Sequence, residues 1–150
     1  MDISTRTVEA MRFAVIEAKG PSIDFRKAWT ELHPTVRAQG LARPGARFAS
    51  LFEADELRAP MSMAWYAAAL QLEEGQVASA PLTERSVEAG SYVTRIYTGP
   101  YEGLASAWGG FIQSILLAEY PPDMSRPCVE RYLDAAPQAE PRTELFVPVI

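Results

Sequence analysis

The sequence predicts an α+β fold of two similar βαββ units related by pseudo-twofold symmetry, and the main observation is a weak internal repeat. Segments 13–29 and 92–108 each contain a Gly-Pro dipeptide with a tryptophan eight residues after the proline, and matched positions lie 79 residues apart. Apolar residues recur at the same offset, as expected of a duplicated structural unit. We therefore expect pseudo-repeats over residues 8–72 and 90–150 within one domain, with antiparallel sheets and a ligand cleft between the units.

The first unit begins with a predicted strand and a predicted helix. Residues 8–17 alternate loosely and end shortly before Gly20-Pro21, which is typical of a strand that leads into a turn. Apolar residues then follow at helical spacing over 25–36. Pro34 is expected to kink or break this helix, and Gly40 is expected to end it.

The rest of the first unit contains one ambiguous segment. Residues 47–52 favour a strand, whereas 61–72 include an Ala-rich stretch with strong helix propensity. The repeat places a strand at 61–72, so we expect a strand there, and we expect residues 73–89 to link the two units. The second unit is predicted to contain a strand at 91–97, a helix at 104–115, and strands at 128–133 and 143–150.

Composition and charge exclude several classes of function. The net charge of −5 and the scattered basic residues argue against direct nucleic-acid binding. No apolar run approaches the roughly 20 residues of a membrane span, and no signal peptide is evident. The single cysteine, Cys128, fits a reducing cytoplasm, and together with the single histidine, His33, it cannot form a Cys/His zinc site. We expect a cytoplasmic protein without metal or cofactor, and we expect His33 to lie outside the cleft.

Two acidic residues on neighbouring predicted strands are the candidates for chemistry. Strand alternation places Glu130 and Tyr132 on one face, and it places Glu144 and Phe146 together on the next strand. If these strands pair, both carboxylates can face one cavity with Tyr132 and Phe146 between them. The alternative is that both acids are solvated strand residues, and that the two repeated tryptophans are anchors of the core.

The second half of the chain resembles the GyrI-like (gyrase-inhibitor-like) effector-binding domain, which is also the ligand-binding part of many AraC- and MerR-type regulators. The matching segments are 97–104 together with Trp108, 128–133 and 142–149. Two features depart from the family pattern: Tyr97 stands where the family often has histidine, and the strand at 64–69 is unusually rich in alanine.

This resemblance implies two βαββ units with a ligand cleft between them. It implies that Glu130 lies at the floor of the cleft, with Glu144 as a second acid and Phe146 as an aromatic wall. It also implies that Tyr101 and Trp108 line the cleft from the helix side. Because only seven residues precede the first predicted strand, we expect a stand-alone ligand-binding module.

The favoured function is the binding of small apolar, aromatic or cationic molecules, for effector sensing or for sequestration of xenobiotics. Glu130 would supply the charge, because a buried cation requires a counter-charge. Aromatic side chains would supply the surface: Trp65, Tyr101, Trp108, Tyr132 and Phe146. The alternative is a hydrolase of small electrophilic xenobiotics with Glu130 as general base. Haem binding by fold analogy and direct gyrase interaction stay open, as does a protein partner or a homodimer.

Overall fold

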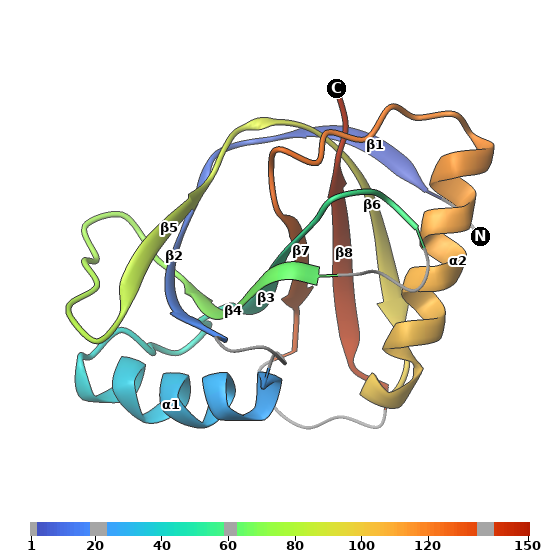
Figure 1. Cartoon of the computed structure of the whole chain (residues 1–150). Helices are drawn as coiled ribbons and strands as arrows, with labels where there is room; N and C mark the ends of the chain where they lie inside the picture. The colour runs from blue at the N-terminus through green and yellow to red at the C-terminus, as the bar shows by residue number, and fades with distance from the viewer. Residues whose placement is uncertain (1–2, 19–23, 59–62, 135–139) are drawn as a thin grey trace.

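The structure, a computed structural model, describes residues 3–18, 24–58, 63–134 and 140–150. These residues form one sheet of eight strands in the order β1-β6-β8-β7-β3-β4-β2-β5, with two α-helices (Figure 1). The elements are β1 (Ser4–Val8), β2 (Met11–Glu17), α1 (Phe25–Ala38), β3 (Phe48–Ala54), β4 (Met63–Gln71), β5 (Thr83–Val87), β6 (Gly90–Thr98), the 3₁₀ turn η1 (Tyr101–Gly103), α2 (Leu104–Leu117), β7 (Cys128–Tyr132) and β8 (Arg142–Pro148).

The α+β class and the antiparallel pairing are confirmed, but the strands form one continuous sheet instead of two adjacent ones. The predicted strand at 8–17 is interrupted at residues 9–10: Val8 ends β1, which pairs with β6, and Met11 begins β2, which pairs with β4 and β5. The expected linker at 73–89 contains β5, which pairs with β2. Since β1 in turn pairs with β6, each half of the chain contributes one edge strand to the other half.

The strand order is symmetric. It reads the same from either end when β1 to β4 are exchanged with β5 to β8. Strands β1 and β5 have equal lengths and begin 79 positions apart, and the same holds for helices α1 and α2. The Gly20-Pro21 turn lies outside the described residues. A common origin of the two halves by duplication stays a prediction.

Local chemistry explains both ends of α1. The Asp24 carboxylate accepts a hydrogen bond from the backbone N–H of Lys27 at 3.0 Å, which caps the first turn. Gly40, with φ of +69°, ends the helix as predicted. The expectation was a kink or a break at Pro34; the helix does not break there, since it continues to Ala38, and a kink stays a prediction. Its buried apolar face on the sheet offsets the one backbone hydrogen bond that proline cannot donate.

The Ala-rich segment forms β4, in agreement with the prediction of a strand. Ala67, Ala68 and Ala69 are fully buried in the middle of the sheet. Ala68 belongs to the core beneath α1, while Ala67 and Ala69 belong to the core on the opposite face. Small side chains on both faces fit a strand that is covered on both sides, so tertiary packing overrides helix propensity.

Both helices pack on the same face of the sheet. Helix α1 contacts β2 and β4, and α2 contacts β6 (Figure 1). The opposite face has its own core, which joins residues from both ends of the sheet, such as Met11, Val87 and Tyr92. Residues from both ends can meet only if the sheet curls around this core. On the helix-bearing face, α1 covers one end of the sheet and α2 covers the other end. The central strands β3 and β7 lie between the two helices.

Candidate ligand-binding site

A cavity of about 410 Å³ lies over β3 and β7, between the two helices. Aromatic and apolar side chains from both helices and from three strands dominate its lining. They include Phe25, Phe52, Tyr66, Leu104, Trp108 and Tyr132. Its size is within the range of small-molecule sites, and the few polar groups among these apolar walls are Ser50, Glu130 and the tyrosine hydroxyls.

Glu130 lies half-buried in this cavity, and neutral groups hold its carboxylate. Its Oε1 accepts a hydrogen bond from Trp108 Nε1 at 2.7 Å, and its Oε2 accepts one from the Tyr132 hydroxyl. The Phe52 ring meets the Trp108 ring edge-on at 5.1 Å, which fixes the indole. No arginine, lysine or histidine among the described residues forms an ion pair with Glu130.

The hydrogen bonds of Glu130 continue as a chain across the cavity floor. The Ser50 hydroxyl lies 2.7 Å from the hydroxyls of both Tyr132 and Tyr66, and Trp29 Nε1 donates to the Tyr66 hydroxyl at 2.8 Å. Because Tyr132 donates its only proton to Glu130, Ser50 must donate to Tyr132. Tyr66 must then donate to Ser50. All these bonds point toward one carboxylate.

This chain crosses the centre of the symmetric sheet. Ser50 of β3 lies directly opposite Glu130 of β7 in the register. Trp29 and Trp108 are each the fifth residue of their helix, and their indole N–H groups donate to the two ends of the chain. The alternative that both tryptophans are only core anchors is therefore incomplete.

The two tyrosine hydroxyls are held in the neutral form. Burial raises the pKa of Tyr132 well above its usual value, and the nearby Glu130 carboxylate raises it further. Burial also raises the pKa of Tyr66. Both hydroxyls therefore remain hydrogen-bond donors over the physiological range. Cys128, on the same strand, is buried, and burial raises the pKa of its thiol to about 12, so it does not supply a thiolate.

A second cavity of about 310 Å³ adjoins the first one and shares Leu104 and Tyr132 with it. Tyr101 lines this second cavity and packs edge-on against Tyr132 with ring centroids 5.8 Å apart. His33 also lines it, with its ring 4.9 Å from that of Phe48. His33 was expected to lie outside the cleft. It does not line the Glu130 cavity, but it does line the adjoining one, so the expectation is wrong for that second cavity.

Glu144 and Phe146 lie on the other face of the sheet, so the expected pair of carboxylates in one cavity is wrong. In the register of β7 and β8, Leu145 lies opposite Glu130, and Arg131 lies opposite Glu144. Residues directly opposite in an antiparallel pair point to the same face. Glu144 therefore binds arginines on that other face, and Phe146 is fully buried in the core there.

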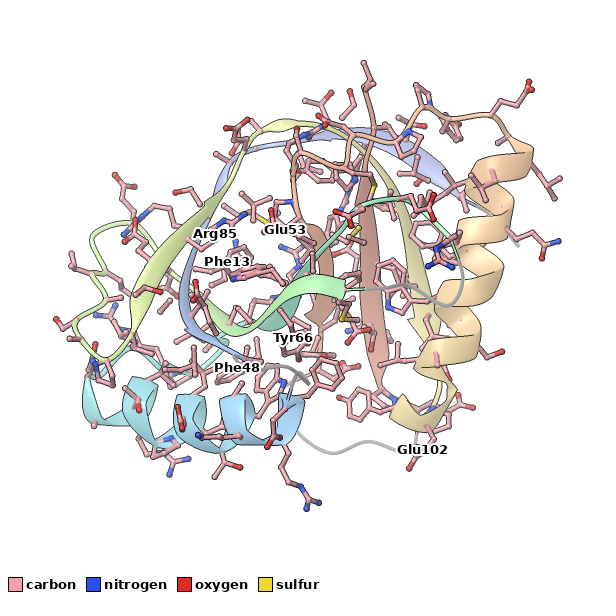
Figure 2. All side chains as sticks on the ribbon, in the orientation of Figure 1. Phe13, Phe48, Glu53, Tyr66, Arg85 and Glu102 are labelled. Carbon is pink, nitrogen blue, oxygen red and sulfur yellow. The ribbon has the colours of Figure 1, made fainter. Side chains whose placement is uncertain are left out.

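Trp65 also points away from the cavity, against the prediction. It packs on the core of the opposite face and lies beneath the Arg85 guanidinium at 4.5 Å. Its neighbour Tyr66 faces the cavity in its place, since successive side chains of a strand alternate. In Figure 2, Tyr66 and Phe48 lie on the side of β4 that faces α1, whereas Arg85 and Glu53 lie on its other side, inside the curl of the sheet.

Sequence reasoning missed Ser50, Tyr66 and Trp29 as site residues. The repeat offered a signal for Trp29, because a functional role for Trp108 implies one for its matched residue. Among the described residues, no cluster of three or more His, Cys, Asp or Glu side chains could hold a metal ion. Within the same ranges, no helix is long and apolar enough to cross a membrane.

Comparison with solved structures finds the same fold in proteins of low sequence identity. The C-terminal domain of EcmrR is 19% identical with a TM-score of 0.74, and the match covers 99% of this chain and 97% of that domain. SAV2435, described as bound to tetraphenylphosphonium, is 12% identical with a TM-score of 0.69, over 100% of this chain and 94% of that one. A hydrolase from Listeria innocua is 16% identical with a TM-score of 0.56, over 99% and 91%.

The same fold is also found in the complex of EcmrR with DNA, where the matched region is 57% of that longer chain. A search of curated protein sequences finds no match. The family model of the GyrI-like small molecule binding domain, in contrast, matches residues 1–150 of this chain. The chain therefore belongs to the family of GyrI-like small-molecule-binding domains.

Proposed function

We propose that the Glu130 cavity binds small aromatic cations. The single observation that carries this proposal concerns the Glu130 carboxylate, which is half-buried among aromatic rings. Among the residues that the structure describes, only the neutral donors of Trp108 and Tyr132 donate hydrogen bonds to it. These donors stabilise the charge but leave it at −1. A ligand cation would supply the missing counter-charge.

The walls of the cavity favour the same class of ligand. Burying an organic cation costs several kcal/mol unless an opposite charge accompanies it. Aromatic faces attract a desolvated cation by about 2 kcal/mol or more. The adjoining cavity, reached past Tyr132 and Leu104, offers room for a further aromatic group of a larger ligand. Tyr101 and His33 would contact that group.

The family and the solved structures support this proposal. SAV2435 has the same fold and is described as bound to tetraphenylphosphonium, which is an aromatic cation. The EcmrR domain belongs to a protein that is described in complex with DNA. A role in sequestering xenobiotics, or in sensing an effector through a protein partner or a second copy of the chain, fits this ligand class.

Glu130→Gln tests the proposal because it removes the charge and keeps the shape. Affinity for tetraphenylphosphonium, measured by calorimetry, should fall by one to two powers of ten, at about 1.4 kcal/mol for each. Binding of neutral triphenylphosphine oxide should stay within about twofold, which is less than 0.5 kcal/mol. Glu102→Gln is the matched control, since Glu102 is exposed on η1 and does not line the cavity (Figure 2). Equal losses for the cation and the neutral compound would refute the proposal.

The same cavity favours one second candidate, hydrolysis of a small epoxide. Glu130 would take a proton from water while the water oxygen bonds to an epoxide carbon and the ring C–O bond breaks. The released alkoxide would then take that proton from Glu130, which gives a diol. The likeness to a Listeria innocua hydrolase supports this candidate. Styrene oxide should yield its diol with the wild-type protein and not with Glu130→Gln, and absence of turnover by the wild type would eliminate it.

A further inference from the structure

A polar cavity of about 560 Å³ lies at one end of the other face of the sheet, away from the Glu130 cavity. Arginine side chains from three segments line it: Arg47, Arg131 and Arg142. Arg131 lies opposite Ala49 in β3 and opposite Glu144 in β8. Arg47 lies two residues before Ala49, and Arg142 lies two residues before Glu144. Because side chains two residues apart in a strand point to the same face, all three arginines share one face. Arg47 and Arg142 are thus each a diagonal neighbour of Arg131, and diagonal neighbours of this kind lie about 7–8 Å apart.

The deepest of these arginines belongs to a cluster with one excess positive charge. The Glu144 carboxylate binds Arg6 at 2.6 Å and Arg131 at 2.7 Å, so one anion serves two cations. Both guanidiniums also lie over the Phe146 ring, at 5.4 Å and 5.1 Å from its centroid. Arg131 keeps only a fifth of its side chain exposed. This positive charge is therefore weakly screened by solvent.

The remaining charges around the cavity add a second excess cation. Arg142 is paired with Asp134 at 3.1 Å, and Glu73 has a partner in Arg43 at 3.7 Å. Arg47 forms no ion pair with any residue that the structure describes, and it is exposed at the edge of the cavity. The charged groups of the lining and their partners thus carry two more positive than negative charges, in a chain whose net charge is −5.

We propose that this arginine cavity binds a small phosphomonoester that carries an apolar group. A phosphomonoester has a charge of about −1.5 to −2 at neutral pH, which matches the local excess. Guanidinium forks bind phosphate oxygens in pairs, and three arginines line this cavity. Leu72 and Leu133 offer the apolar contact for the substituent. This site is independent of the proposed cation site, because Arg131 and Glu130 point to opposite faces of β7.

Calorimetry with phenyl phosphate tests the inference. The wild-type protein should bind it saturably, and Arg47→Gln should weaken binding by at least about tenfold, or about 1.4 kcal/mol. Arg47 makes no ion pair within the described part of the chain, so this variant should keep its fold. Arg37→Gln is the matched control, because it removes the same charge from an exposed position on α1. Neither Arg37→Gln nor Glu130→Gln should change the affinity.

Three outcomes would overturn the inference. The first is that the wild-type protein shows no saturable binding of phenyl phosphate at millimolar concentration. The second is an equal loss in Arg47→Gln and Arg37→Gln, which would show a general effect of net charge. The third is that benzoate, a monoanion, binds as tightly as phenyl phosphate, since the local excess of two charges favours the dianion.

Discussion

Removing the Ser50 hydroxyl should weaken both the fold and the cavity, because Ser50 joins the two halves of the hydrogen-bond chain. Ser50→Ala deletes two hydrogen bonds of 2.7 Å, one to Tyr66 and one to Tyr132. Each such bond contributes about 0.5–1.5 kcal/mol net, so the loss should total about 1–3 kcal/mol. Ser50 and Tyr66 are only 3% and 6% exposed, so the Tyr66 hydroxyl would be left buried without its acceptor.

Urea unfolding followed by tryptophan fluorescence measures this loss. Ser106→Ala is the matched control, since Ser106 is exposed on α2 and should change the free energy of unfolding by less than about 0.5 kcal/mol. A double-mutant cycle of Ser50→Ala with Tyr66→Phe should show a coupling energy of at least about 0.5 kcal/mol. If Ser50→Ala is as stable as the control, or if the coupling energy is zero, the chain of hydrogen bonds through Ser50 does not hold the cavity floor together.

Two further predictions concern stability. Gly110→Ala should raise the free energy of unfolding by about 0.8–1 kcal/mol in the same urea assay, because Gly110 is exposed in α2 and an added Cβ meets no atom within 4 Å; a loss of stability would show that an unseen contact needs this glycine. The raised pKa of Tyr132 means that the folded state keeps its proton after the unfolded chain has lost it, so stability should fall as pH rises above about 10. Tyr132→Phe should make that fall shallower in unfolding measured against pH, and an unchanged slope would contradict the assignment.

The sequence by itself determined the class of fold, and it predicted Glu130 as the central acid of the proposed site. The 79-residue repeat identified two units with corresponding helices, and strand alternation placed Glu130 and Tyr132 on one face. The fold class and the shared face of Glu130 and Tyr132 agree with the structure, because both follow from local periodicity and from spacing along the chain. Propensity alone would have made β4 a helix, and the repeat corrected that assignment.

Only the tertiary structure decided which residues share a cavity with Glu130. The register of β7 with β8 placed Leu145 opposite Glu130, and this sent Glu144 to the other face. Alternation within each strand is visible in the sequence, but the choice of face depends on a one-residue shift between strands. The pairing of β3 with β7 likewise brought Ser50 beside Glu130 from 80 positions away. No local pattern encodes such a contact, because packing of the whole sheet sets the register.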